Sequence, residues 1–221
     1  MAAYLLRPML DELVFVGGSV TGLLITDGAA NEPRATFDVD AIAEISSYAE
    51  YTAFGERLRA LGFAADTREA APLCRWVHES TILDVMPLDE KILGFSNCWY
   101  RAAMDAAERR KLSEDLEIRI VTAPFFVATK LEAYKSRGKG DLFGSADLED
   151  LLAVVDGRAE LVAEVQAAPD DLLAYLRREI QALCGTVGFL DALPGYLLPD
   201  AASQTRIKII MERLEALTSL N

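Results

Sequence analysis

Two stretches, FVGGSV at residues 15–20 and FDVDAI at residues 37–42, decide the expected fold of this chain. The first is an apolar run that enters a Gly-Gly-Ser turn, as a short buried strand does. The second alternates, so Asp38 and Asp40 project from one face of a strand while Val39 projects from the other. Two carboxylates held that close repel each other unless a cation lies between them. The pattern therefore predicts a cation site beside the turn.

The turn itself is expected to bind phosphate. Gly17 and Gly18 allow a positive φ angle and a close approach of the backbone to a ligand. Ser19 is placed to cap a helix over residues 19–26, whose free amide groups favour an anion. This would bring a phosphate-binding turn and a pair of carboxylates onto neighbouring strands.

A third carboxylate, Asp84, stands in the middle of the apolar stretch TILDVMP at residues 81–87. This stretch and LCRWVHE at residues 73–79 are expected to form a strand pair joined at Ser80. Hard carboxylate oxygens suit magnesium, and a two-metal site needs such a pair of acids with a third nearby. Asp38, Asp40 and Asp84 therefore predict a Mg²⁺ (or Mn²⁺) site. The alternative is that Asp38 and Asp84 are strand-end acids in solvent.

A strand, a Gly-Gly-Ser turn and a strand bearing Asp-Val-Asp, in this order, resemble the nucleotidyltransferases of the DNA polymerase β superfamily. The interval from Ser19 to Asp38 is longer than is usual there, and the extra residues fall in the polar loop DGAANEP (residues 27–33), where an insertion costs little. The resemblance implies an α+β fold with a mixed sheet and flanking helices. It also implies transfer of a nucleoside monophosphate from an NTP to an acceptor hydroxyl, which Asp84 would activate.

A second resemblance lies in residues 126–158, FVATKLEAYKSRGKGDLFGSADLEDLLAVVDGR. This stretch is similar to the AbiEii-type nucleotidyltransferases of bacterial toxin–antitoxin and phage-defence systems, the MenT toxins among them, through Lys130, Leu131, Ala133, Arg137, Asp147 and Asp150. The resemblance implies nucleotide binding by Lys130 and Arg137 and a catalytic role for Asp147. It also implies an RNA acceptor, the 3′ end of a tRNA, and a cognate antitoxin protein as a partner.

The residues themselves leave several interpretations open for this second region. Lys130 lies on an apolar helix face, where a buried ammonium is costly unless an anion such as a triphosphate accompanies it. Otherwise it is a lysine that extends its ammonium to the helix edge. We expect Lys130→Ala to weaken NTP binding and Lys130→Met to fold at least as stably as the wild type, because an apolar chain fits this helix face better. Asp147 and Asp150, three residues apart, share a helix face. Either an aspartate caps the helix and both acids favour its dipole, or Asp147 holds Lys130 or orients the acceptor hydroxyl. Arg137 and Lys139 flank glycines and either close over phosphates or remain solvated.

Two parts of the chain are expected: an α/β nucleotidyltransferase core over residues 1–122 and a helical domain over residues 123–221 that completes the active site. Within the first part, the spacing of apolar residues predicts a helix over residues 46–63 that stops at Gly62. From Ala123 onward the pattern is helical almost to the end.

Composition and charge limit the kinds of partner, compartment and metal site that we expect. The net charge of −13 argues against a general nucleic-acid coat, but Arg109, Arg110 and Lys111 are expected on one short helical stretch, as an RNA contact or a solvated face. No apolar run approaches the roughly 20 residues of a membrane span, and no leader pattern is present, so we expect a cytoplasmic protein. The single histidine, His78, and three scattered cysteines predict no zinc site and reduced thiols.

Two functional classes remain open from the sequence. The first is an enzyme whose acceptor is RNA, a protein or a small molecule of the aminoglycoside kind. The second is a non-catalytic, nucleotide-binding or antitoxin-like partner that keeps the same fold. The presence of all three strand acids favours the enzyme.

Overall fold

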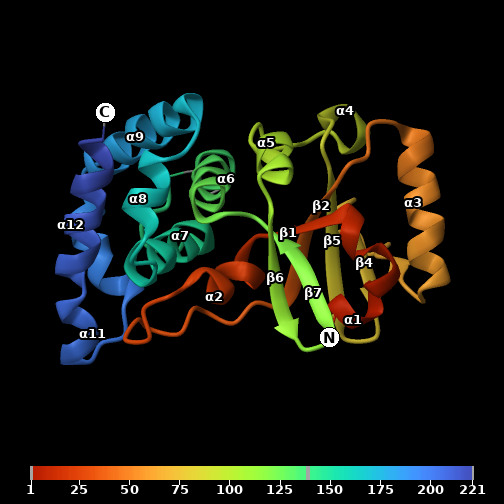
Figure 1. The fold of residues 1–221 in the computed structure, drawn as a ribbon, viewed down its shortest axis with the longest axis horizontal. Coiled ribbons are helices and arrows are strands. Elements are labelled where there is room, and N and C mark those ends of the chain that lie inside the picture. The colour runs from red at the N-terminus through yellow and green to blue at the C-terminus, as the bar shows by residue number, and fades with distance from the viewer. Residues whose placement is uncertain (1, 138–139, 221) are drawn as a thin grey trace. The chain divides into compact units, whose positions relative to one another are not determined.

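The computed structural model describes residues 2–137 and 140–220 of the chain. Contacts divide the chain into two compact units. The first consists of Met1–Val20 and Ala35–Thr122, and the second consists of Thr21–Arg34 and Ala123–Asn221. The first unit contains a sheet with helices and the second is helical, so the predicted α+β class and the helical carboxy-terminal region are confirmed (Figure 1).

The first unit is built on a mixed sheet of seven strands in the order β3-β4-β5-β2-β1-β7-β6. The strands are β1 (Leu13–Val16), β2 (Asp38–Ala43), β3 (Ala64–Ala65), β4 (Arg75–His78), β5 (Thr81–Pro87), β6 (Glu108–Ser113) and β7 (Leu116–Ile120). Strands β2 and β5 are parallel, as are β1 and β7, whereas the other neighbours are antiparallel. The central strands β1, β2 and β5 are largely buried, which accounts for their apolar sequences.

The hairpin of β4 and β5 confirms the predicted strand pair. His78 pairs with Thr81, so Glu79 and Ser80 form a two-residue turn. Glu79 has a φ of 52°, as the tight turns that match the twist of a hairpin require. This register places Arg75 opposite Asp84.

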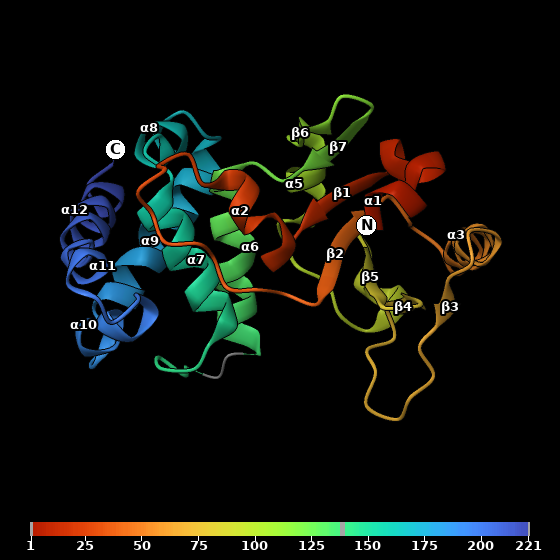
Figure 2. The ribbon, with the colours of Figure 1, turned by 90° about the horizontal axis from the view of Figure 1, so that it is seen from below.

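Helix α3 (Tyr48–Ala60) packs on the β4 end of this sheet and confirms the predicted helix that stops at Gly62. Ser47 caps it by accepting a hydrogen bond from the amide of Glu50. A Cβ on Gly55 would come within 2.9 Å of the ring of Trp76, so α3 packs closely on the face that carries Trp76. The loop between β3 and β4 extends away from the sheet (Figure 2). The short helices of this unit are α1 (Ala2–Leu5), η1 (Arg7–Glu12), η2 (Gly18–Val20), α4 (Glu90–Leu93) and α5 (Tyr100–Asp105).

The prediction of a helix around Arg109, Arg110 and Lys111 is wrong, because these residues belong to the edge strand β6. Alternation sends Arg109 and Lys111 to one side and Arg110 to the other, so the three do not form one basic face. Arg109 also pairs with Asp11 and Glu117. Charged side chains are a common protection for a sheet edge against pairing with another chain.

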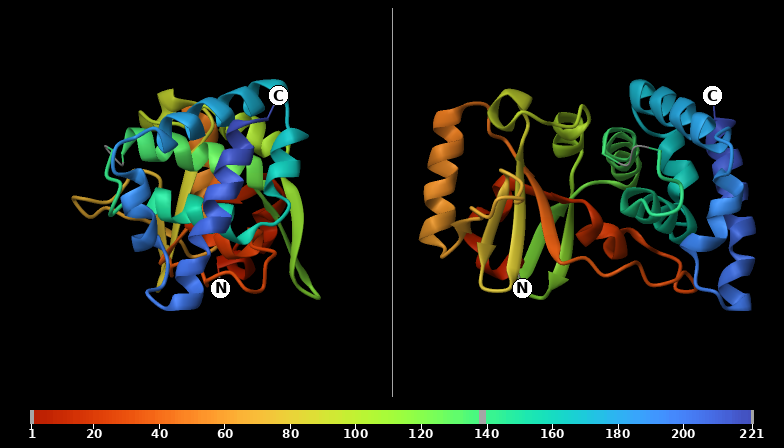
Figure 3. Two further views of the ribbon diagram at one scale, coloured as in Figure 1. Left: turned by 90° about the vertical axis from the view of Figure 1, so that its left-hand side faces the viewer. Right: turned by 180° about the vertical axis from the view of Figure 1, so that it is seen from behind.

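The second unit is helical. Its elements are α2 (Thr21–Leu24), α6 (Ala123–Ser136), α7 (Ala146–Gly157), α8 (Leu161–Gln166), α9 (Asp170–Cys184), α10 (Phe189–Ala192), η3 (Leu193–Tyr196), α11 (Ala201–Thr205) and α12 (Ile207–Thr218). Helix α7 packs against α6, and α12 packs against both α7 and α9 (Figure 3). Phe126, Leu148 and Phe189 are among the fully buried side chains of this unit.

Segment 21–34, which includes the predicted loop insertion, packs with the helical unit. The amides of Thr26 and Asp27 both donate to the carbonyl of Gly157, at the end of α7, over 2.9 Å. Asp27 also accepts a hydrogen bond from Arg206, whose guanidinium pairs with the buried Asp156. These contacts give a polar segment a fixed path along the helices.

Within the described part of the chain, no helix combines the length and the apolar character needed to cross a membrane.

Candidate functional site

Three aspartates meet on one face of the sheet in the first unit. Asp40 on β2 is in register with Asp84 on the parallel strand β5, and Asp38 lies two residues before Asp40. Because paired residues and alternate residues share a face, all three carboxylates project to the same side, opposite α3. Asp84 is only 6% exposed, so it is not a strand-end acid in solvent.

Arg75 binds two of these three carboxylates. Its Nε and Nη2 atoms donate to the two oxygens of Asp84 over 2.8 and 2.7 Å, as a bidentate pair. The same Nη2 also donates to Oδ2 of Asp38 over 3.0 Å. The hydrogen bond to Asp84 raises the pKa of Arg75 above its ordinary value, even though burial opposes this. A permanent cation therefore bridges Asp38 and Asp84.

The Gly-Gly-Ser turn lies directly against the remaining carboxylate. Gly17 has a φ of +67°, and a Cβ at this position would fall 2.0 Å from Oδ2 of Asp40. Both the backbone angle and the contact require glycine here. The turn and the acids are thus brought together, as the sequence predicted.

The helix expected over residues 19–26 is shorter than predicted, since only residues 18–24 are helical as η2 and α2, and Ser19 does not cap it. Ser19 lies inside the single turn η2, and its hydroxyl donates to the carbonyl of Val16 over 3.2 Å. Helix α2 follows with only four residues before the chain enters segment 25–34. The physical reason is that the chain beyond α2 is drawn into the hydrogen bonds with Gly157 described above. The helix-terminus explanation for phosphate binding at Ser19 is therefore wrong.

Among residues 2–137 and 140–220, no three or more His, Cys, Asp or Glu side chains are grouped as a metal centre. The donor chemistry nevertheless fits a hard cation, since all three side chains are carboxylates and a cationic nitrogen already bridges two of them. Asp38, Asp40 and Asp84 are the residues that would hold Mg²⁺ or Mn²⁺. Arg75 would first have to release at least one oxygen.

The other predicted site residues meet in a second group, within the helical unit. The ammonium of Lys130 on α6 donates to Asp147 over 3.0 Å and to Asp150 over 2.6 Å, both on α7. Lys130 is 4% exposed. The interpretation of Lys130 as a lysine that reaches the helix edge is wrong, because two aspartates of the same unit supply its anion partner. Asp147 and Asp150 share a helix face as predicted, and Ser145 rather than either aspartate caps α7.

Two arginines complete this group. Arg137 at the end of α6 makes a bidentate pair with Asp147, at 2.7 and 2.8 Å. Arg34, from the segment before β2, makes a bidentate pair with Asp150, both bonds being 3.0 Å. Burial alone would raise the pKa of Asp147, but the hydrogen bond from Arg137 and the charge of Lys130 outweigh it and hold the pKa below its usual value. Lys139, predicted beside Arg137, lies outside the described residues.

Sequence reasoning missed both Arg75 and Arg34. The register of a hairpin with a two-residue turn at Glu79 and Ser80 places Arg75 opposite Asp84, so a signal for Arg75 was present. Arg34 meets Asp150 across 116 residues of sequence, and no local pattern indicates that contact.

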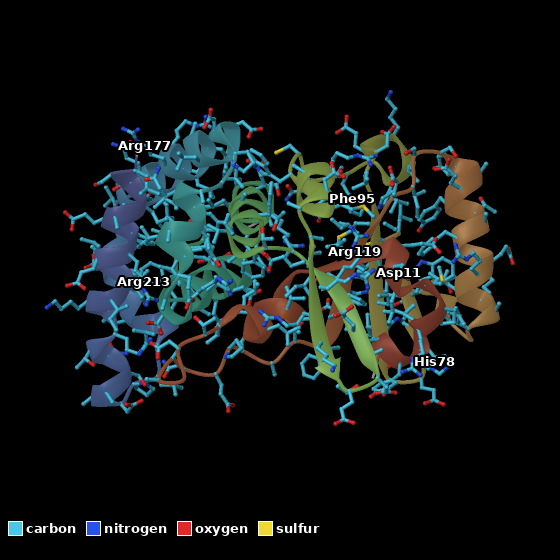
Figure 4. All side chains as sticks on the ribbon, in the orientation of Figure 1. Asp11, His78, Phe95, Arg119, Arg177 and Arg213 are labelled. Atoms are coloured by element: carbon cyan, nitrogen blue, oxygen red, sulfur yellow. The ribbon has the colours of Figure 1, made fainter. Side chains whose placement is uncertain are left out.

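A separate cavity of about 300 Å³ in the first unit is lined by Asp11, Glu12, Ala43, Glu44, Phe54, Met104 and Arg119. Its three carboxylates pair with arginines of the same unit. Arg119 donates to the carbonyl of Asp11, and both residues are labelled in Figure 4. None of the predicted site residues lines this cavity.

Comparison with known proteins adds little to this geometry. No family model matches the sequence, and no curated protein matches it. Among solved structures, the chain is similar to the crystal structure of JHP933 from Helicobacter pylori, with 12% identity and a TM-score of 0.44, over 97% of this chain and 88% of that one.

The contact between Gly17 and Asp40 predicts that Gly17→Ala is strongly destabilising. A positive φ costs an alanine about 1–2 kcal/mol, and the new methyl group would also overlap the carboxylate of Asp40. Gly94→Ala is the matched control, because Gly94 has a φ of +80° but no atom within 4 Å of the added Cβ. Urea denaturation should show a larger loss for Gly17→Ala, and equal losses would contradict this role of Asp40.

The buried pairing of Lys130 reverses the expectation for Lys130→Met. Two buried carboxylates would lose their shared ammonium, and we expect the free energy of unfolding to fall by about 3 kcal/mol, since Arg34 and Arg137 remain bound. Lys135→Met, on the same helix, removes a half-exposed lysine and should cost less than about 1 kcal/mol. Comparable denaturation midpoints for the two variants would refute the role of the buried pair.

The lowered pKa of Asp147 predicts a loss of stability in acid. A depressed pKa means that the folded protein binds this proton less readily than the unfolded chain, so the stabilisation is complete above the ordinary value of 3.8 and is lost as the pH falls through the folded value. Asp147→Asn removes this component. Between about pH 5 and pH 3 the free energy of unfolding should therefore fall less steeply in the variant than in the wild type. Parallel curves would contradict the prediction.

Proposed function

We propose that this protein is a metal-dependent nucleotidyltransferase that moves a nucleoside monophosphate from an NTP to an acceptor hydroxyl. The observation that carries the proposal is the set of three carboxylates on two parallel strands, packed against a glycine turn that admits no side chain. A purely structural sheet gains nothing from this set, because like charges on one face destabilise it.

Each predicted site residue of the first unit has a separate role in the proposed reaction. Asp38, Asp40 and Asp84 hold the divalent cation, which when bound would offset the charge of the nucleotide phosphates. Gly17 lets the turn lie directly against the carboxylate of Asp40, and we assign to Gly17, Gly18 and Ser19 the binding of a phosphate beside the cation. Asp84 accepts the proton of the acceptor hydroxyl; its carboxylate has lone pairs beyond the two that Arg75 occupies. Positioning and charge stabilisation carry the rate in reactions of this kind.

Residues of the second unit enter the proposal through the resemblance to AbiEii-type enzymes. Arg137, whose side chain is 72% exposed, is the group's best-placed cation for a phosphate. Lys130 is buried and forms ion pairs with Asp147 and Asp150. It can contribute to nucleotide binding only if these ion pairs break. We assign Asp147 the role of orienting Arg137 and Lys130.

For the acceptor we propose RNA, the 3′ end of a tRNA, with the protein acting as the toxin-like component of a toxin–antitoxin or phage-defence system and a cognate protein as its antitoxin. This part of the proposal rests on the resemblance in residues 126–158. The basic residues of β6 give it no support, since they are split between two faces. A protein or an aminoglycoside-like small molecule is the alternative acceptor.

One observation favours a second candidate function, a non-catalytic nucleotide-binding or antitoxin-like partner. Arg75 already pairs with Asp38 and Asp84, so these acids are partly neutralised without any metal. A protein that had lost catalysis while keeping its fold could retain such a pair. Direct measurement of label transfer separates the two classes.

The decisive experiment uses Asp40→Ala. Protein is incubated with each labelled NTP, Mg²⁺ or Mn²⁺, total RNA and cell lysate, and the labelled fraction is identified. Loss of a metal ligand should reduce transfer by more than tenfold, which is about 1.4 kcal/mol of barrier, while the fold survives because one of several like charges is removed. Asp115→Ala, an exposed acid of the same unit, is the control and should transfer as the wild type does.

Three results would change the proposal. Retention of more than about a tenth of the wild-type rate by Asp40→Ala would remove Asp40 from the site. Label found only on protein or on a small molecule would replace the RNA acceptor. Nucleotide binding without transfer to any fraction would favour the non-catalytic partner.

A further inference from the structure

Arg75 contacts two of the three aspartates, and it lay outside the sequence prediction. We propose that Arg75 is a positioning residue with two roles: it holds Asp84 in place, and it competes with the divalent cation for Asp38. The inference rests on the proposed function, because it concerns the same cation site.

The register of the hairpin fixes the first role. Arg75 on β4 stands directly opposite Asp84 on β5, so the two side chains leave the sheet on the same face. The planar guanidinium meets both carboxylate oxygens through two parallel hydrogen bonds, of 2.8 and 2.7 Å. A lysine cannot reproduce this fork, since its ammonium is a single point of charge. Asp84 is thereby held in one orientation.

The contact with Asp38 is different in kind. Only Nη2 reaches it, over 3.0 Å, and the other oxygen of Asp38 accepts a hydrogen bond from the hydroxyl of Thr36 over 2.8 Å. The side chain of Asp38 is 37% exposed, whereas that of Asp84 is 8% exposed. Arg75 can therefore release Asp38 to an incoming cation and still keep both hydrogen bonds to Asp84.

The charge of the two competing cations determines which of them Asp38 binds. The single positive charge of Arg75 is shared between the carboxylates of Asp38 and Asp84. A divalent cation offsets more negative charge and suits carboxylate oxygens, but it must take an oxygen of Asp38 that Nη2 now binds. Arg75 thus lowers the affinity for the metal and keeps the acids ordered when no metal is bound.

Loss of the two roles should change metal affinity and kcat in opposite directions, and this distinguishes them from a purely structural role. Removal of Arg75 should strengthen metal binding, because the competitor and a positive charge are both gone. The same change should lower kcat, because Asp84 loses its fixed orientation. A residue that only stabilised the fold would weaken binding and turnover together.

The test is a direct titration with Mn²⁺, with free Mn²⁺ followed by its electron paramagnetic resonance signal. Arg75→Met should bind Mn²⁺ about tenfold more tightly than the wild type, and Arg75→Lys should fall between them. Arg57→Met is the matched control, since Arg57 makes a bidentate pair with Glu12 in the same unit and its loss should leave the affinity unchanged. Unchanged or weaker binding by Arg75→Met, or an equal gain by Arg57→Met, would overturn the proposal.

Loss of Arg75 leaves the buried Asp84 without its partner, so a second comparison protects the test from misfolding. Asp84→Asn removes the buried charge, and adding Arg75→Met to it should again strengthen Mn²⁺ binding relative to Asp84→Asn alone. Equal affinities for these two proteins would refute the competition for Asp38.

The outcome is distinguishable from failure of the proposed function. If Arg75→Met gains Mn²⁺ affinity while no NTP labels any acceptor, the inference about Arg75 stands and the transferase proposal fails. If the wild type transfers label and Arg75→Met binds Mn²⁺ no better, only the inference about Arg75 fails. Absence of Mn²⁺ binding by every variant overturns the inference.

Discussion

Repulsion between carboxylates on one face of a sheet is the constraint on which the first unit depends. The parallel register of β2 and β5 brings Asp38, Asp40 and Asp84 together, and the neighbouring elements accommodate their charge. Arg75 on β4 supplies a fixed cation, and Gly17 leaves room for the carboxylate of Asp40. A register shift of one residue would send these side chains to the opposite face, so the sheet has little freedom in how it pairs.

The helical unit also pairs its buried acids with cations. Around Asp147 and Asp150 lie three cations, Lys130, Arg34 and Arg137, and Arg34 also lies 4.0 Å from Glu149, so three cations meet three carboxylates. Lys130 is enclosed while the two arginines reach towards solvent. A buried ion pair with this many hydrogen bonds is costly to break by removing one member, but adds little stability over apolar packing. Its presence between α6 and α7 therefore suggests a requirement other than stability, which the proposed phosphate contact would provide.

The sequence predicted features that local patterns encode. Alternation identified β2, the apolar run identified β1, and the helix that ends at Gly62 followed from its spacing and stop signal. The charged strand β6 was missed because an edge strand with both sides in solvent carries no apolar alternation. The partners of Lys130 were predicted only in part. A buried lysine needs an anion partner, and the sequence left a nucleotide triphosphate and Asp147 as alternatives; it did not indicate Asp150 as a partner of Lys130, nor the contact of Arg34 with Asp150.

The path of segment 21–34 has a consequence for how the chain can be divided. The backbone leaves the first unit after Val20, follows the helical unit, and returns at Ala35 just before Asp38; it crosses once more between Thr122 and Ala123. The two units are therefore discontinuous in sequence and are joined by three separate covalent links. A cut at any single link leaves them tethered, and a fragment ending at residue 122 carries Thr26 and Asp27 without the carbonyl that binds their amides. Neither unit is an uninterrupted segment of the sequence, and the stretch that runs from the glycine turn to the aspartate strand includes residues 21–34, which pack with the helical unit.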